Sequence, residues 1–387
     1  MKRISQITIL VHDLASASLI RAYLLAKSLS QMGYEIEIVG FIFSDKLYQE
    51  IPDGVKIIAI KGAHYPEFLM SIAEIMKKIK GDLIYAVKPQ PGSFGVALLN
   101  KLYTQRPVIL DIDDWELSWY GGDEWQYRPT FKQLVRDILK KDSLLRYPNH
   151  PLYLKWMEKL VNQANAVTVH THFLQKRFGG SFVPNGKDTV LFDPHKYDEE
   201  ECRNRYGLSG YKILMFPGSP RPYKGLEDVL VALDKLNQPD IKLVIVGGNP
   251  YDDYDDQLIQ KWGRWIIKLP NYPINMMPEV VAAAHIVVVP QRDTPATQAQ
   301  FPLKITDGMA MAKPVLATKV GDIPEILAET GYIVEASSPE QIADKIEWIF
   351  QNLEEAQEKG KLARERCINN YSINTMSTIL AKIIQGL

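Results

Sequence analysis

Along most of the chain, short apolar runs rich in β-branched residues alternate with amphipathic helical segments, and this alternation constrains the fold most strongly. Strands joined by helices pair in parallel, and the helices cover both faces of the resulting sheet. In the first half, strands are expected at 6–11, 35–43, 55–60, 83–87, 107–112 and 166–170. A helical pattern at 16–32 follows the first strand and ends at Gly33. The sequence therefore predicts an α/β fold with a mostly parallel sheet.

The alternation stops in an irregular polar stretch, residues 193–211, and then begins again. A second series of strands is expected at 212–216, 242–248, 265–269, 285–290, 313–318 and 331–335, with a helix at 224–236 after the first of them. A chain of 387 residues has enough material for two domains, each with its own core. We therefore expect two doubly wound domains, divided between residues 192 and 193, with a ligand cleft outside the carboxyl ends of their strands.

Composition excludes several classes of protein. The formal net charge of −1 argues against a nucleic-acid partner, which would require a basic excess. Cys202 and Cys367 provide neither a disulfide framework nor metal-ligand spacing, so a reducing compartment is expected. The sequence has no uncharged apolar run of about 18 residues, the length of a membrane span. A cytoplasmic protein is therefore expected, with peripheral membrane attachment left open.

The loop after the first strand of the second series has the composition of an anion site. Gly218 allows the backbone to turn, and a helix is expected to begin near Lys224. Such loops present backbone N–H groups and the positive end of a helix to an anion. Arg221 and Lys224 would add full positive charges, as a pyrophosphate requires. The alternative is an ordinary strand–helix loop with solvated basic residues.

A second helix start, near Phe301, carries a single carboxylate one turn further in. The N–H groups of Leu303 and Lys304 are unpaired at the helix start, where the dipole favours an anion. Asp307 lies on the same face as Leu303, about 6 Å away along the axis. That spacing suits a nucleoside diphosphate, with its phosphate at the amides and its ribose diol at the acid. The alternative is an aspartate that faces solvent in the middle of a helix.

Polar residues also follow two strands of the first half. His12, Asp13 and Ser16 come after the first strand and are expected at the cleft, on the acceptor side. Three acids lie at the end of the strand at 107–112, namely Asp111 within it and Asp113 and Asp114 just after it. They could bind a metal or sugar hydroxyls, although such acids more often cap helices or face solvent. His170 and His172 alternate at a strand tip, but two histidines alone are more often structural. We therefore expect no metal site.

Three motifs in this order and spacing resemble the family 4 retaining glycosyltransferases of GT-B fold. They are "PNGKDTVLFDP" at 184–194, "GSPRPYKG" at 218–225 and "FPLKITDGMAMAKPVLATKVGDIPEIL" at 301–327. The resemblance implies two Rossmann-like domains that face each other across a cleft. It assigns the acceptor to domain 1–192 and a nucleotide-sugar donor to domain 193–371, with the last helix, about 372–387, crossing back onto the first domain.

The resemblance also implies roles for individual residues of the donor site. Lys224 matches the family's basic residue on the phosphates, and Asp307 matches the glutamate that binds the ribose hydroxyls. Leu303 and Lys304 fall where backbone amides meet the distal phosphate. The donor-binding set expected from the loop, the helix start and the resemblance is Gly218, Ser219, Arg221, Lys224, Phe301, Leu303, Lys304 and Asp307.

Several positions depart from the family's pattern. The glutamate that usually meets the donor sugar falls on Ala299, and the family's phosphate-binding arginine falls on Ser219, with Arg221 the nearest replacement. Asp113 stands where the family often has a histidine. Contacts to sugar hydroxyls are expected from candidates on both sides of the site, namely His12, Asp13, Ser16, Asp113, Asp114, Asp293, Gln298 and Gln300.

The implied activity is transfer of a hexose from a UDP-sugar, UDP-glucose or a relative, with retention and without a metal or another cofactor. The acceptor would be a saccharide or lipid-linked saccharide in polysaccharide or glycoconjugate biosynthesis, such as exopolysaccharide assembly. Lys224, Arg221 and Asp113 are the residues expected at the reaction centre. Two alternatives remain: an enzyme of the same fold with another reaction, such as an epimerase or a phosphorylase, and a non-catalytic nucleotide-sugar binder.

Residues 128–147 have the pattern of a basic amphipathic helix. Its apolar face would comprise Phe131, Leu134, Val135, Ile138 and Leu139, and it is surrounded by Lys132, Arg136, Lys140 and Lys141. Such a helix can rest on an anionic bilayer, which would suit a lipid-linked acceptor. The alternative is an ordinary helix whose apolar face packs on the first domain.

Overall fold

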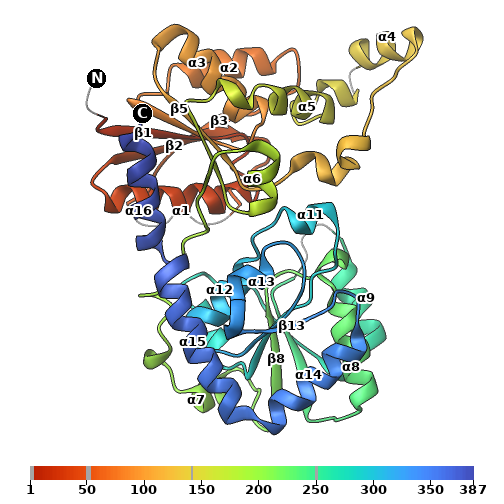
Figure 1. Cartoon of the computed structure of the whole chain (residues 1–387). Coiled ribbons are helices and arrows are strands. Elements are labelled where there is room, and N and C mark those ends of the chain that lie inside the picture. Colours follow the sequence, from red (N-terminus) through yellow and green to blue (C-terminus); the bar gives the residue numbers. More distant parts are fainter. Residues whose placement is uncertain (1–3, 49–53, 141–142, 249–251) are drawn as a thin grey trace. The chain divides into compact units, whose positions relative to one another are not determined.

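The computed structural model describes residues 4–48, 54–140, 143–248 and 252–387, and the chain forms two compact units (Figure 1). Unit 1 comprises Met1–Asn185 and Met376–Leu387, and unit 2 comprises Gly186–Thr375. The division therefore falls seven residues before the position expected from the polar stretch, and the C-terminal segment returns to unit 1 at Met376, close to the expected residue 372.

Unit 1 is built on a seven-stranded parallel sheet in the order β3-β2-β1-β4-β5-β6-β7. The strands are β1 (Gln6–Val11), β2 (Glu35–Ile42), β3 (Lys56–Lys61), β4 (Leu83–Val87), β5 (Val108–Ile112), β6 (Ala166–Val169) and β7 (Ser181–Phe182). The six predicted strands are confirmed within one residue at each end. The two-residue β7 has no apolar alternation to reveal it.

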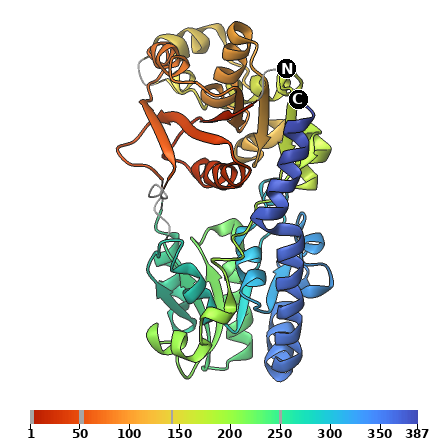
Figure 2. The ribbon, with the colours of Figure 1, turned by 90° about the vertical axis from the view of Figure 1, so that its left-hand side faces the viewer.

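Helices cover both faces of this sheet. The helices of unit 1 are α1 (Ser18–Gln31), α2 (Phe68–Met76), α3 (Val96–Thr104), α4 (Phe131–Leu139), α5 (Pro151–Lys159), α6 (His172–Phe178) and α16 (Ile373–Gln385), and of these α4 buries no side chain. On one face α1 and α16 bury apolar side chains with β1, β2 and β4, and α16 contributes Met376, Leu380 and Ile384 to this core. Figure 2 shows α16 in dark blue beside the unit 1 sheet. The Oγ atoms of Ser28 on α1 and Ser377 on α16 are hydrogen-bonded at 2.8 Å.

Unit 2 repeats the architecture with a six-stranded parallel sheet in the order β10-β9-β8-β11-β12-β13. Its strands are β8 (Lys212–Pro217), β9 (Ile241–Val246), β10 (Ile266–Leu269), β11 (Ile286–Val289), β12 (Val315–Thr318) and β13 (Tyr332–Val334). All six were expected from the sequence. Their continuous apolar runs are explained by burial on both faces.

Nine α-helices of the described chain belong to unit 2. They are α7 (Glu199–Arg205), α8 (Leu226–Leu236), α9 (Tyr254–Trp262), α10 (Met277–Ala282), α11 (Pro295–Gln298), α12 (Leu303–Ala310), α13 (Ile323–Leu327), α14 (Pro339–Gln351) and α15 (Leu353–Tyr371). One core joins the sheet to α10, α12 and α15, and a second joins it to α8 and α14. The two helices expected near the anion sites begin two residues later than predicted, at Leu226 and Leu303, because a short 3-10 turn (Pro222–Lys224) and the extended Pro302 precede them.

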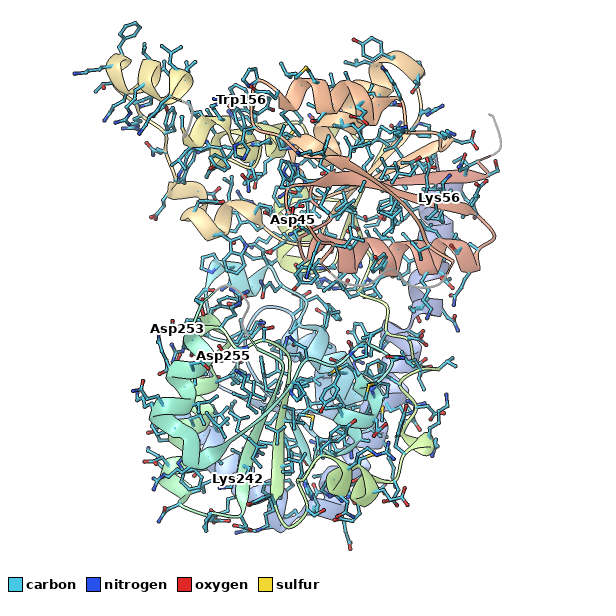
Figure 3. The ribbon with its side chains drawn as sticks, turned by 180° about the vertical axis from the view of Figure 1, so that it is seen from behind. Asp45, Lys56, Trp156, Lys242, Asp253 and Asp255 are labelled. Carbon is cyan, nitrogen blue, oxygen red and sulfur yellow. The ribbon has the colours of Figure 1, made fainter. Side chains whose placement is uncertain are left out.

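Helix α4 does not pack its apolar face on the rest of unit 1. None of its side chains is buried, and Phe131, Ile138 and Leu139 are 83%, 57% and 76% exposed. Figure 3 shows α4 projecting from the unit, with Trp156 of the neighbouring α5 labelled. The expected helix at 128–147 is therefore shorter, Phe131–Leu139, and the interpretation that its apolar face packs on the domain is wrong for α4. Ser143 and Leu145, later in the segment, are buried. Lys141, assigned to the basic flank, lies outside the described residues.

Candidate active site

The loop after β8 brings two lysine side chains together at one point of unit 2. Lys224 donates from Nζ to the backbone oxygen of Ser219 at 3.0 Å. Lys304, at the start of α12, lies across Gly218, where an added Cβ would be 2.8 Å from its Nζ. Both ammonium groups lie near the ring of Phe216, with Nζ-to-centroid distances of 5.9 and 5.0 Å. The loop and the helix start therefore form one cationic site.

The charges of this site are mutually unfavourable in the absence of an anion. Burial lowers the pKa of Lys224 well below its ordinary value, and the charges of Lys304 and Arg221 lower it further. Burial also lowers the pKa of Lys304, although the carboxylate of Asp307 acts in the opposite direction. Like charges brought together at a half-buried position favour binding of a multivalent anion, which removes their repulsion.

The start of α12 adds amide donors to the same site. The N–H groups of Leu303 and Lys304 have no acceptor within the described chain, as expected for the first turn of a helix. Pro302 precedes them in an extended conformation and has no N–H to satisfy. Phe301, by contrast, is 4% exposed, and its ring packs 5.8 Å from that of Tyr371, so its side chain belongs to the core and not to the ligand surface.

Asp307 forms an ion pair that no local sequence pattern predicts. Its Oδ1 accepts from Nζ of Lys187, and the two side chains are 13% and 10% exposed. Lys187 also places its ammonium 3.1 Å from the centroid of the Phe192 ring. Lys187 stands in the "PNGKD" motif but received no role, because its partner is 120 residues away in the sequence.

Three of the residues expected to contact sugar hydroxyls, Asp293, Gln298 and Gln300, lie around α11. Gln298 donates from Nε2 to Oδ1 of Asp293 at 2.8 Å, so these two side chains already form a pair. Gln300 accepts a long hydrogen bond, 3.5 Å, from Nε2 of Gln291. Ala299, where the family pattern has a glutamate, is completely buried. Polar groups are therefore present on both sides of Ala299, but not at that position.

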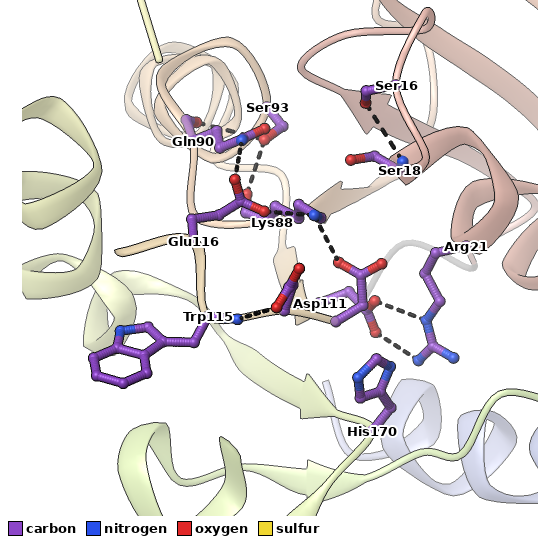
Figure 4. A network of polar contacts seen from close by, with 12 residues as sticks. Ser16, Ser18, Arg21, Lys88, Gln90, Ser93, Asp111, Trp115, Glu116 and His170 are labelled. Carbon is purple, nitrogen blue, oxygen red and sulfur yellow. Dashed lines mark hydrogen bonds and ion pairs between the residues drawn. The ribbon is translucent and has the colours of Figure 1, made fainter. Parts of the chain in front are cut away.

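In unit 1, the carboxyl ends of β4 and β5 hold a network of charged side chains (Figure 4). Lys88 adopts φ +67° and pairs with Glu116 at 2.5 Å and with Asp113 at 3.9 Å. Burial raises the pKa of Asp113 to about 6, and the charge of Lys88 limits the rise. Burial likewise raises the pKa of Asp114 to about 7. A non-glycine residue with positive φ is strained, and such strain occurs often at functional sites.

Asp111 is not available for a metal or a sugar. It is fully buried and forms a two-point ion pair with Arg21, with Nε to Oδ2 at 2.8 Å and Nη2 to Oδ1 at 2.9 Å. Arg21 also donates to Oδ1 of Asn185 at 2.9 Å and so ties α1 to the end of unit 1. Among the described residues, no group of three or more His, Cys, Asp or Glu side chains could hold a metal ion.

The residues after β1 have local structural partners. His12 is 4% exposed and accepts at Nδ1 from the N–H of Gly92 at 3.0 Å. Burial lowers the pKa of His12 to about 4, so the ring is neutral near pH 7 and can donate only from Nε2. Asp13 accepts from the N–H of Ala15, and Ser16 donates to the backbone oxygen of Asp13. These contacts shape the turn into α1.

Comparisons with known proteins agree with this architecture. The family model "Glycosyl transferases group 1" matches residues 211–352. The GDP-mannose-dependent alpha-(1-6)-phosphatidylinositol monomannoside mannosyltransferase of Mycolicibacterium smegmatis is 25% identical over 246 residues, which are 59% of this chain and 64% of that protein. The chain thus spans less than two thirds of that relative. The N-acetyl-alpha-D-glucosaminyl L-malate synthase of Bacillus anthracis is 23% identical over 360 residues, 90% of this chain and 88% of that protein.

Solved structures match the fold over the whole chain. Anabaena HepE in complex with UDP-glucose superposes with a TM-score of 0.75 and 16% identity, covering 99% of this chain and 100% of that one. WaaG, a glycosyltransferase involved in lipopolysaccharide biosynthesis, superposes with a TM-score of 0.68 and 14% identity, covering 98% and 100%. The two parallel-sheet units are those of the GT-B fold. Residues 211–352 thus match the glycosyl transferases group 1, and the fold of the whole chain is that of GT-B glycosyltransferases such as HepE and WaaG.

Proposed function

We propose that the protein transfers a hexose from a nucleotide sugar to a saccharide or lipid-linked saccharide, with retention at the anomeric carbon. The observation that carries the proposal is the convergence of Lys224 and Lys304 beside the unpaired amides of Leu303 and Lys304. A diphosphate would satisfy both ammonium groups and the helix start at once. Mannosyl- and glucosaminyl-transferring relatives support a sugar-transfer reaction.

The mechanism follows from where charge develops. When the anomeric bond breaks, the departing diphosphate gains negative charge and the sugar becomes oxocarbenium-like. Lys224, Lys304 and Arg221 would stabilise the departing diphosphate, and preorganised charges of this kind are usually the largest catalytic contribution. The leaving phosphate takes the proton of the acceptor hydroxyl during front-side attack. The reaction thus needs no protein nucleophile, and the lysine charges take the place of a metal ion.

UDP-glucose or a related UDP-sugar is the proposed donor, and no cofactor besides this co-substrate is proposed. The fold neighbour HepE has been solved with UDP-glucose, whereas the mycobacterial relative is named for GDP-mannose. A thermal-shift panel of UDP-, GDP- and ADP-sugars would separate these carriers.

Donor hydrolysis without acceptor, abolished in Lys224→Ala, would distinguish a transferase from a non-catalytic binder. If Lys224→Ala binds and hydrolyses the donor like the parent, the assignment of this lysine to the phosphates is wrong.

We also propose that the protein acts in the cytoplasm, against the inner face of the membrane, through residues 128–147. Thr130 caps α4 by accepting from the N–H of Gln133, so the helix has a defined start although it packs on little else. Its exposed apolar side chains lie beside Lys132, Arg136 and Lys140, which complement an anionic surface. In the described chain, no helix is both long and apolar enough to cross a membrane.

Sedimentation with anionic vesicles at low salt tests this contact. The parent should pellet, and the double variant Phe131→Glu/Leu139→Glu should stay in the supernatant. Leu362→Glu is the matched control, because Leu362 is also exposed (54%) but lies on α15 of unit 2. A parent protein that stays in the supernatant, or a control that loses binding equally, would exclude the membrane contact.

A further inference from the structure

We infer that Lys187 determines the pentose specificity of the nucleotide site, because it meets the pentose as a pair with Asp307. The inference deepens the proposed function and rests on it. The ion pair occupies only Oδ1 of Asp307, and Oδ2 accepts no hydrogen bond within the described chain. Asp307 lies one helical turn from the amides at the start of α12, about 6 Å along the axis, a spacing that suits a nucleotide's phosphate and ribose.

Lys187 is held at this position by its backbone as well as its side chain. Its N–H donates to the oxygen of Tyr371 at 2.6 Å, and its own oxygen accepts from the N–H of Ile373 at 3.0 Å. Its ammonium lies over the Phe192 ring and against Asp307. A lysine fixed in this way has already lost its rotamer freedom, so a contact with a ligand would cost little further entropy.

The pair has the chemistry to recognise a vicinal diol. A carboxylate only accepts hydrogen bonds, whereas each ribose hydroxyl can donate one and also accept. An ammonium has three N–H donors, and Lys187 uses one of them on Asp307. Asp307 can therefore accept from the diol at Oδ2 while Lys187 donates to a hydroxyl oxygen. A 2′-deoxynucleotide lacks one hydroxyl and would leave part of the charged pair unsatisfied.

If the ion pair between Lys187 and Asp307 had only a structural role, a different result would be expected. The pair would join α12 to the segment that begins unit 2, and its loss would lower stability without changing the choice between pentoses. The quantity that separates the two interpretations is the ratio of the dissociation constants for 2′-deoxy-UDP and UDP. A merely structural residue does not change this ratio, because both ligands share the base and the diphosphate.

The experiment measures this ratio by titration calorimetry on the full chain. For the parent we expect UDP to bind about 10- to 100-fold more tightly than 2′-deoxy-UDP, the usual effect of a hydrogen bond to a charged group. Lys187→Met should reduce the ratio to within about threefold of unity, and Lys187→Arg, which keeps the charge, should retain part of it. Asp307→Asn should also reduce it, and the double variant should lose little more, because the two residues act together.

Lys313→Met is the matched control. Lys313 is a lysine with a 4% exposed side chain that pairs with Glu199 at 2.7 Å in the same unit, away from the proposed pentose position. It should lower the melting temperature but keep the parent's ratio. A Lys187→Met protein with the parent's ratio would overturn the inference while leaving the proposed function intact. A parent that binds neither UDP nor any other nucleoside diphosphate would overturn both.

Discussion

Lys304 lies across Gly218, and the missing side chain of the glycine provides the space for the lysine. Gly218 has φ +152°, and an added Cβ would come within 2.7 Å of Cε and 2.8 Å of Nζ of Lys304. The position of this ammonium therefore depends on a residue 86 positions earlier in the sequence. Lys304 was expected to act through its backbone amide alone. The structure places its side chain at the proposed phosphate site as well.

Gly218→Ala should displace Lys304 and weaken nucleotide binding. We expect the affinity for UDP to fall about tenfold or more, because a charge-assisted hydrogen bond is lost. Titration calorimetry measures the change. Gly207→Ala is the control for backbone strain, since Gly207 has φ +68° in the same unit but nothing within 4 Å of an added Cβ. Equal losses of affinity in the two variants would contradict the proposed role of Lys304.

Lys224→Ala should reduce turnover by a factor of about 10² to 10³, the range seen when one group that stabilises developing charge is removed. The rate of donor hydrolysis, monitored through the nucleoside diphosphate that it releases, measures the effect. Lys235→Ala is a suitable control, because Lys235 is an exposed lysine on α8 that pairs with Glu340. A rate within threefold of the parent would show that Lys224 does not contact the leaving group.

Nucleotide binding should take up protons and weaken as pH rises. In the free protein, burial and like charges hold the pKa of Lys224 low. A bound diphosphate supplies opposite charge and raises that pKa again, so the complex holds more protons than the free protein. Affinity is therefore lost as pH rises through the lowered pKa. Calorimetry in buffers of different ionisation enthalpy measures the uptake, and proton release on binding would contradict this account.

The network of charged side chains at the carboxyl ends of β4 and β5 should determine how the reaction rate falls at low pH. If Asp113 must be ionised to orient the attacking water, which replaces the acceptor hydroxyl in hydrolysis, the rate of donor hydrolysis should rise with pH through about 6, the raised pKa of this carboxyl. Lys88→Met removes a charge that lowers this pKa, so the fall in rate should move to higher pH. Asp113→Asn should abolish this fall. A profile that is the same in parent and both variants would remove Asp113 from the reaction.

The ion pair between Arg21 and Asp111 should stabilise unit 1. Arg21→Met would leave a buried carboxylate without its partner, and breaking such a pair costs about 3–5 kcal/mol. Urea unfolding, with a probe in the unit that carries each substitution, measures the loss of unfolding free energy. Arg264→Met removes a surface pair with Asp234, in which the side chains are 62% and 42% exposed, and should lower stability much less. Similar losses of unfolding free energy in both variants would contradict the prediction that the buried pair contributes more to stability than the surface pair.

The sequence predicted the strands well, because buried parallel strands leave continuous apolar runs such as 83–87 and 286–289. Helix starts were displaced by two residues, since a 3-10 turn and an extended proline do not interrupt the apolar pattern. Residue types also indicated Lys224 and Asp307 as candidates. Their partners and surroundings depend on contacts between distant segments, which no local pattern records.

Lys187, Lys88 and Arg21 were missed for this reason. Their partners Asp307, Glu116 and Asp111 lie 120, 28 and 90 residues away. In the sequence, Lys88 and Lys187 are basic residues beside a strand and a turn, and Arg21 is one more basic residue within the predicted helix 16–32. The exposed apolar face of α4 was equally unpredictable, because periodicity shows that a helix is amphipathic but not what its apolar face contacts.

The most direct test of the central claim is a crystal structure of the protein with UDP. We predict that the distal phosphate lies within hydrogen-bonding distance of the amides of Leu303 and Lys304 and of the ammonium groups of Lys224 and Lys304, with the ribose at Asp307. A diphosphate bound instead by residues of unit 1, with the start of α12 unoccupied, would contradict the claim.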